Sequence, residues 1–113
     1  MTPKQLATLI GKAAEDVQAV DLLVLDLTRL TSFTDYFVIC SGKSDTQVRA
    51  IADSVQKKLK LKDRNPLGIE GYNQGLWVLL DYGDVVAHIF YREVREHYNL
   101  EKLWADAPIA HAL

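Results

Sequence analysis

The sequence predicts a single α/β domain in which helices flank a mixed five-stranded sheet. Two segments repeat apolar residues at three- and four-residue spacing, as amphipathic helices do. Two shorter runs are rich in Leu, Val and aromatic residues and have the length of strands. A later stretch of apolar residues on either side of a Tyr-Gly pair is the strongest hairpin signal in the chain. The expected order of elements is α-β-β-α-β-β-β-α.

The composition indicates a soluble globular protein. The chain of 113 residues is expected to form one domain over 1–113, with 49% hydrophobic and 25% charged residues. A net charge of −2 gives no bias toward nucleic acid. The single Cys40 excludes an internal disulfide and fits a reducing compartment. The N-terminal segment lacks the apolar core of a signal peptide, and no run reaches the roughly 20 apolar residues of a membrane span, so a cytoplasmic location is expected.

The first helix is expected to begin at Pro3 with Thr2 as its cap, because proline is tolerated where the N–H has no partner. Its predicted apolar face consists of Leu6, Leu9, Ile10, Ala13, Val17 and Val20. Residues 21–27 and 35–40 are almost continuously apolar and are predicted to be strands buried on both faces. The polar residues 28–34 between them have the length of a hairpin or a short loop.

Ser44 and Gln47 have the spacing of a capping box and mark the start of a second helix. Its predicted apolar face consists of Val48, Ile51, Ala52, Val55 and Leu59. The lysine-rich residues 57–62 are expected to form a solvated helix end, where cations suit the helix dipole. Residues 67–72 read as a short strand, so the passage from 35 to 72 predicts a right-handed parallel crossover.

The C-terminal part of the chain predicts one more helix over residues 92–104. Its apolar residues are Val94, Tyr98, Leu100, Leu103 and Trp104. The tail 105–113 is expected to be loose, which leaves a folded core over about 3–104.

A Gly-Lys-Ser triplet at residues 42–44 raises the question of a phosphate-binding loop. A Walker A loop reads G-x-x-x-x-G-K-[ST], which would require a first glycine where Phe37 stands. The intervening residues are apolar and typical of a strand. The triplet therefore predicts a strand exit at Gly42 and a helix cap at Ser44.

The second enzymatic interpretation is a nucleotidyltransferase, which needs paired carboxylates on a strand to hold divalent ions. The short strand offers Glu70 alone, beside Gly71, while Asp81 and Asp84 flank the hairpin turn. The three histidines, His88, His97 and His111, lack zinc-site spacing, and Cys40 sits in an apolar strand. We therefore expect no catalytic residue, no metal and no cofactor, and at most the fold of such an enzyme.

The hairpin over residues 76–91 is predicted to turn at Tyr82-Gly83, which would pair Asp81 with Asp84 and Trp77 with His88. One face is then core, and consists of Leu76, Val78, Leu80, Val85, Ala87, Ile89 and Tyr91. The other, the mixed hairpin face, consists of Trp77, Leu79, Asp81, Asp84, Val86, His88 and Phe90. Aromatic groups rimmed by acids are typical of a protein-binding surface. A covering helix would explain the same pattern, and the alternation alone does not choose between the two.

Several stretches now form a specific pattern: "TSFTDYFVICSGKS", "IAD", "GIEG", "WVLLDYGDVVAHIF" and "YNLEKLW". In this order they resemble the bacterial ribosomal silencing factors of the Iojap-like family, from about residue 3 to 104. The resemblance implies a translational repressor without enzymatic activity. Such a protein binds large-subunit ribosomal protein fourteen, blocks joining of the small subunit and lowers translation when nutrients are short. It also implies a nucleotidyltransferase-like fold without the catalytic acids, and a possible homodimer.

The resemblance assigns a role to the mixed hairpin face. Carried over position by position, the expected partner-binding residues are Trp77, Leu79, Asp81, Asp84, His88 and Phe90, with Glu70 and Gly71 as secondary candidates. Tyr98, Leu103 and Trp104 are expected to pack inside the protein. A nucleotide-binding enzyme remains the alternative at this point.

Overall fold

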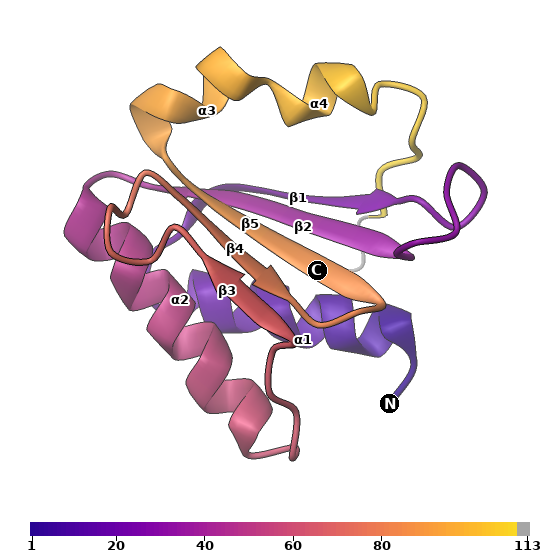
Figure 1. Ribbon diagram of the computed structural model, residues 1–113, viewed down its shortest axis with the longest axis horizontal. Coiled ribbons are helices and arrows are strands. Elements are labelled where there is room, and N and C mark those ends of the chain that lie inside the picture. Colours follow the sequence, from indigo (N-terminus) through magenta and orange to yellow (C-terminus); the bar gives the residue numbers. More distant parts are fainter. Residues whose placement is uncertain (111–113) are drawn as a thin grey trace.

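The structure, a computed structural model that describes residues 1–110, is built around one five-stranded sheet. Its elements are α1 (Pro3–Glu15), β1 (Val20–Asp26), β2 (Tyr36–Gly42), α2 (Asp45–Lys60), β3 (Gly68–Glu70), β4 (Trp77–Asp81), β5 (Val85–Tyr91), α3 (Arg92–Tyr98) and α4 (Leu100–Leu103). The strands lie in the order β1-β2-β5-β4-β3. α1 and α2 cover one face, and α3 and α4 cross the other (Figure 1). The predicted α/β class and mixed sheet are confirmed.

The first helix begins as its sequence predicts. Thr2 Oγ1 accepts a hydrogen bond from the Gln5 N–H at 3.1 Å, and Gln5 Oε1 accepts one from the Thr2 N–H at 2.9 Å. Pro3 occupies the first turn, where its missing N–H costs nothing. The helix ends before Val17 and Val20, which the periodicity had included in its apolar face, and Val20 opens β1 instead.

The strands pair in a way that the sequence predicted only in part. β1 pairs antiparallel with β2 at one edge of the sheet, so it is partly buried rather than buried on both faces. β2 pairs parallel with β5 and is buried along most of its length, as predicted. The sequence predicted that the crossover through α2 leads from β2 to β3 as its parallel neighbour, and this was wrong. β3 runs in the same direction as β2 but lies at the far edge of the sheet, beyond β5 and β4. The long apolar β5, rather than the short exposed β3, fills the central position.

The junction between β2 and α2 explains the Gly-Lys-Ser triplet. Ser44 Oγ accepts a hydrogen bond from the Gln47 N–H at 3.0 Å, as predicted. Gln47 Oε1 reaches one residue further back than in a capping box and accepts from the Lys43 N–H at 2.7 Å. Gly42 fits a crowded position, because a Cβ there would lie 3.0 Å from Val48 and the start of α2 would have to shift. All the predicted apolar residues of this helix are buried: Val48, Ile51, Ala52, Val55 and Leu59.

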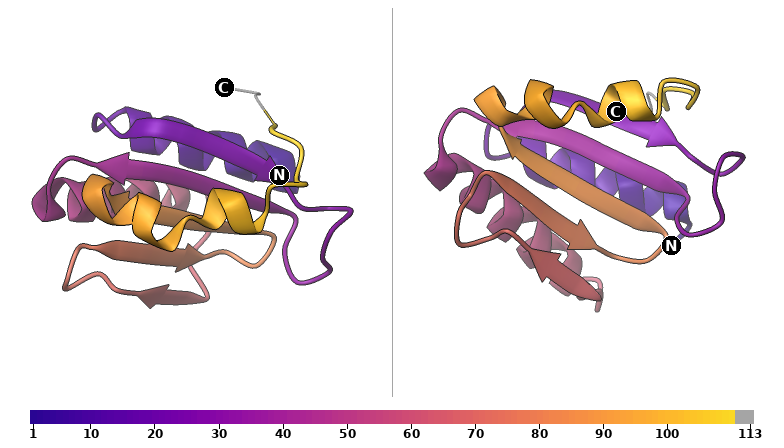
Figure 2. Two further views of the ribbon diagram at one scale, coloured as in Figure 1. Left: turned by 90° about the horizontal axis from the view of Figure 1, so that it is seen from above. Right: turned by 45° about the horizontal axis from the view of Figure 1, so that its top comes forward.

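The C-terminal helix is divided in two. Asn99 has a φ of +48°, which separates α3 from α4. Arg95 attaches α3 to the sheet, because its Nη1 donates to the Asp21 carbonyl at 2.7 Å and to Ser41 Oγ at 3.0 Å. Figure 2 shows both helices lying across the strands on the face opposite α1 and α2. The prediction of one continuous helix was therefore wrong at Asn99, which takes the left-handed conformation more readily than most residues.

The segment after α4 returns to the sheet and is not loose through residue 110. Ile109 forms an antiparallel bridge with Leu25 of β1, and Ala107 is buried. The Ala110 N–H also donates to the Val24 carbonyl at 2.8 Å. Backbone groups at the outer edge of β1 attract this pairing because an edge strand leaves them unpaired. Residues 111–113, including His111, lie outside the described residues.

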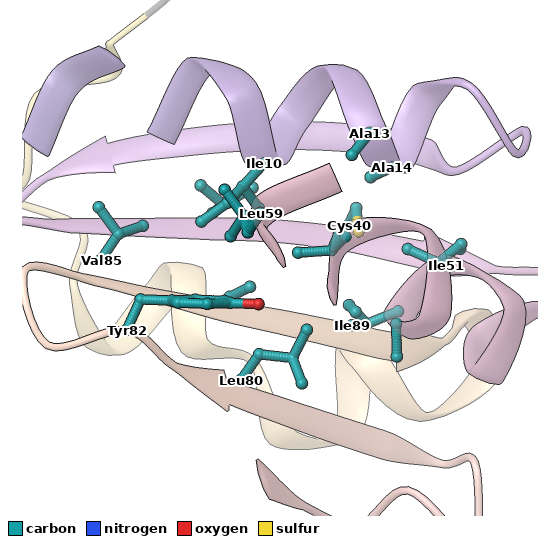
Figure 3. Close-up of a cluster of buried hydrophobic side chains, with 14 of the residues drawn as sticks. Ile10, Ala13, Ala14, Cys40, Ile51, Leu59, Leu80, Tyr82, Val85 and Ile89 are labelled. Atoms are coloured by element: carbon teal, nitrogen blue, oxygen red, sulfur yellow. The ribbon is translucent and has the colours of Figure 1, made fainter. Parts of the chain in front are cut away.

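The main core lies between the sheet and the helices α1 and α2 (Figure 3). Cys40 is one of its buried residues, and burial raises the pKa of its thiol to about 12. The prediction that this cysteine packs in the core is confirmed. A second cluster lies beneath the C-terminal helices and includes Leu25, Leu27, Phe37, Ile39, Val86, Phe90 and Ala107. Within residues 1–110, every helix is too short or too polar to cross a membrane.

Candidate functional site

The hairpin turn is displaced by one residue from its predicted place, and the cross-strand pairs change with it. Trp77 pairs with Phe90, Leu79 with His88, and Asp81 with Val86. The two-residue loop is Gly83-Asp84, and Gly83 has a φ of +84°. Hairpin turns favour glycine at a positive-φ position, where a tyrosine would be strained. Each residue of β4 pairs with a partner two positions further along β5 than predicted. Since a shift of two residues preserves the alternation, each side chain keeps its predicted face of the sheet.

The predicted core face of the hairpin is confirmed at most positions. Val78, Leu80, Val85, Ala87 and Ile89 are buried beneath α1 and α2. Leu76 is 46% exposed, so its assignment to the core was wrong. It directly precedes β4 and lines an open hollow at the start of α2.

The mixed hairpin face is divided between a covered part and an open part. Phe90 and His88 are buried, with Val86 beside them, on the strand that the C-terminal helices cross. Trp77, Leu79 and Asp81 on the neighbouring β4 are half-buried. Asp84 in the turn is exposed. The covering interpretation is therefore correct for β5, whereas β4 leaves a partly open surface whose role in protein binding stays a prediction.

An aromatic cluster surrounds Trp77. Its indole stacks on Phe90 with ring centroids 5.0 Å apart, and Tyr98 of α3 lies 4.7 Å away. The indole Nε1 donates a hydrogen bond to His88 Nδ1 at 3.1 Å. Burial lowers the pKa of His88 to about 4, so this imidazole is neutral near pH 7. The predicted contact between Trp77 and His88 is present, although it runs diagonally across the ladder.

A hollow of about 380 Å³ lies beside this cluster at the turn end of the hairpin. It is lined by Phe33, Phe37, Leu67, Leu79, Asp81, Gly83, Val86 and His88. Phe33 is 65% exposed and Leu67 is 78% exposed. Sequence reasoning assigned neither to the site, since Phe33 stands alone in a polar loop and Leu67 was assigned only to the predicted short strand 67–72. The available signal was weak, namely a large apolar side chain in the polar segment 28–34 and another just after Pro66.

One acidic residue, Asp81, lies at the rim of this hollow, and Glu70 lies on the same face of the sheet. Asp81 Oδ1 accepts a hydrogen bond from the Gly83 N–H at 2.8 Å, which leaves its second oxygen for another donor. Glu70 is exposed and lies directly opposite Leu79, so it belongs to the same face. Gly71 has a φ of +79°, and a Cβ there would collide with the Trp77 carbonyl oxygen. Its role is therefore to permit the turn between β3 and β4.

Two of the aromatic and aliphatic residues predicted to pack inside the protein lie at its surface. Tyr98 is half exposed beside Trp77, and Leu103 is 74% exposed. Trp104 is half-buried, and its ring meets Phe37 at 5.7 Å. The prediction was wrong for Leu103, because its side chain lies on the side of the short α4 that faces away from the sheet.

The enzymatic interpretations gain no structural support. Phe37 lies within β2 and Gly42 ends that strand, so the residues before Lys43 form a strand and not a loop that could enclose phosphates. Lys43 and Ser44 line an open hollow of about 470 Å³ together with Asp45, Gln74, Leu76 and Tyr91. Within residues 1–110, no three side chains of His, Cys, Asp or Glu are grouped as metal ligands.

Comparison with known proteins identifies the family. The family model described as "Ribosomal silencing factor during starvation" matches residues 1–112. The ribosomal silencing factor RsfS of Bacillus subtilis is 42% identical over 110 residues, which cover 97% of this chain and 93% of that protein. The chloroplastic protein Iojap of Zea mays is 36% identical over 101 residues, covering 89% of this chain and 44% of that protein.

Solved structures agree with these matches. A crystal structure from Chromobacterium violaceum has a TM-score of 0.91 and 38% identity, and the match covers 100% of this chain and 94% of that one. One from Bacillus halodurans has a TM-score of 0.86 and 38% identity, with 96% and 98% covered. The resemblance read from the sequence motifs is confirmed, and the chain belongs to the ribosomal silencing factor family.

Proposed function

We propose that this protein represses translation by binding large-subunit ribosomal protein fourteen on the large ribosomal subunit. Bound there, it sterically blocks the small subunit and lowers translation when nutrients are limiting. Family membership supports action on the ribosome. The proposal places this protein in the cytoplasm, acting without catalysis and without a cofactor, and it allows a homodimer.

The observation that carries the proposal is the open part of the mixed hairpin face. Trp77 and Leu79 lie half-exposed beside the hollow, and the exposed Phe33 and Leu67 extend the apolar area across two loops. Asp81 contributes a carboxylate at the rim. An aromatic anchor with apolar neighbours and a polar rim is the usual anatomy of a protein-binding surface.

The residues of this face have different roles in the proposal. Trp77 is the anchor, and Leu79 extends the apolar contact. Asp81, Asp84 and Glu70 meet basic groups of the partner, since surface carboxylates provide charge complementarity. The buried His88 and Phe90 support the surface from beneath, and Gly71 keeps β3 in place beside it.

Co-sedimentation with separated large and small ribosomal subunits tests this function. We expect the wild-type protein to sediment with the large subunit and to prevent reassociation of the two subunits. A Trp77→Ala variant should lose about 2 kcal/mol or more of binding free energy, roughly a 30-fold loss of affinity, if Trp77 is a hot spot. Circular dichroism would verify that the variant remains folded.

Two equally exposed leucines provide a test of whether the hollow belongs to the ribosome-binding surface. Leu67 and Leu61 are each 78% exposed, but Leu67 lines the hollow and Leu61 caps α2. Leu67→Ala should weaken large-subunit binding several-fold, whereas Leu61→Ala should bind like wild type. Equal binding by both variants would remove the hollow from the interface.

The alternative function is nucleotide binding at the open hollow that contains Lys43 and Ser44. It predicts no binding to either subunit, together with saturable, magnesium-dependent nucleotide binding that Lys43→Ala weakens. Isothermal titration calorimetry with nucleotide and magnesium tests this alternative. Absence of binding heat would exclude it.

A further inference from the structure

The packing around Trp77 leaves its orientation open. The indole stacks on Phe90, with an interplanar angle of 25°, and contacts Tyr98 at a centroid distance of 4.7 Å. The χ2 torsion of tryptophan has a broad, roughly two-fold preference. A half-turn about it would keep the ring between the same neighbours and move its N–H to the other side. Stacking alone therefore does not decide which edge of the indole faces the sheet.

One hydrogen bond makes that choice. The Trp77 Nε1–H donates to His88 Nδ1 at 3.1 Å, between strand positions that lie diagonally across the ladder. The indole has no other polar atom. Since its N–H is used inside the protein, the part of Trp77 that remains exposed is entirely apolar.

The same hydrogen bond defines the state of the imidazole. Nδ1 accepts only when it carries no proton, so the neutral ring of His88 is protonated on Nε2. Within residues 1–110, that Nε2 is buried and has no hydrogen-bond partner, while Phe37 packs against the ring at 4.5 Å. An apolar side chain here would leave no unpaired donor. What the imidazole adds at this position is the acceptor for Trp77.

We propose that His88 is a positioning residue, which orients Trp77 for the partner surface without touching the partner itself. The proposal rests on the function proposed above, in which Trp77 is the anchor. His88 is 4% exposed and offers almost no contact area. An indole already held in one orientation loses less conformational freedom when the partner binds, which favours affinity.

The first test uses the unaltered protein. Long-range ¹H–¹⁵N correlation spectra near pH 7 report which imidazole nitrogen carries the proton. We expect Nε2 to carry it in His88, and the Trp77 indole N–H to exchange slowly with solvent. The chain has two tryptophans, so the spectrum of Trp77→Phe assigns the indole signal. A proton on Nδ1, or an indole N–H that exchanges freely, would overturn the proposal.

The second test separates the acceptor from the bulk of the side chain. In His88→Asn, the carboxamide oxygen lies close to the position of Nδ1, whereas His88→Leu has a similar size and no acceptor. We expect His88→Leu to bind purified large subunits about three- to tenfold more weakly, which corresponds to one hydrogen bond. His88→Asn should stay within about twofold of wild type. In a Trp77→Phe background the two substitutions should have equal effects.

The other outcomes are equally clear. Equal losses in His88→Asn and His88→Leu, with Trp77 intact, would assign His88 to packing alone. A folded His88→Leu variant that binds as tightly as wild type would also overturn the proposal. If the wild-type protein does not sediment with large subunits, the proposed function fails and the positioning role for a partner fails with it. The spectra then still decide whether His88 orients Trp77.

Discussion

His88 shows how a single buried residue makes the stability of this protein depend on pH. Burial lowers the pKa of its imidazole to about 4, whereas the unfolded chain should titrate near 6.5. Between these two pH values the unfolded chain binds a proton that the folded protein does not. The free energy of unfolding must therefore fall as the pH falls from 6.5 to 4, and this group has no effect above 6.5.

We expect this residue to remove on the order of 3 kcal/mol of stability between pH 6.5 and 4. Urea unfolding at several pH values in this range would measure the loss. A His88→Asn variant, which cannot titrate there, should show a shallower pH dependence. Asp26 acts at lower pH, since hydrogen bonds from Thr28 lower its pKa, and it is present in both proteins. Parallel loss of stability in wild type and variant would contradict the role of His88.

At the scale of elements, the short edge strand β3 depends on the glycine that follows it. Gly71 has a positive φ of 79°, and any side chain there would collide with the Trp77 carbonyl oxygen. Gly68, at the start of the same strand, has nothing within 4 Å of a Cβ position. Gly71 therefore cannot accept a side chain, whereas Gly68 has space for one.

Gly71→Ala is expected to lower the free energy of unfolding by about 2 kcal/mol or more, because it combines a strained backbone with a steric collision. Gly68→Ala should change it by no more than about 0.5 kcal/mol. Urea unfolding of both variants provides the comparison. If the two substitutions cost the same, the tight turn between β3 and β4 is not what holds this edge.

At the scale of the whole molecule, the two faces of the sheet are closed in different ways. Two long helices cover most of one face, while α3, α4 and the following segment cover only part of the other. Arg95 connects this covering to distant parts of the chain. It contacts Asp21 and Ser41 on the sheet, and its Nε lies 3.2 Å from Glu101 Oε1. The candidate site lies where the covering stops.

Substitution of Arg95 should therefore loosen the C-terminal segment as a unit. We expect Arg95→Met to lower the free energy of unfolding by about 1.5–3 kcal/mol, the usual value of hydrogen bonds to a charged group. Hydrogen exchange in residues 92–110 should accelerate more than in α1 and α2. Arg92→Met, an exposed position on the same helix, is the control. Similar exchange in the two variants would show that Arg95 does not hold the covering in place.

The sequence by itself determined the features that depend on near neighbours in the chain. The caps at Thr2 and Ser44 and the buried face of α2 follow from hydrogen bonds and periodicities that span a few residues. The face on which each hairpin residue lies was also predictable, because strand alternation survives a register shift of two. The motifs further identified the family, which the comparisons confirmed.

The tertiary structure alone decided what depends on distant segments. Alternation does not say which strand lies at an edge, so β1 and the destination of the crossover were misjudged. Nor could it say that C-terminal helices would bury His88 and Phe90 and leave Trp77 half-open, or that Phe33 and Leu67 would meet beside it. Burial is a property of surfaces that come together in the folded chain, and residues far apart in sequence contribute to each of them.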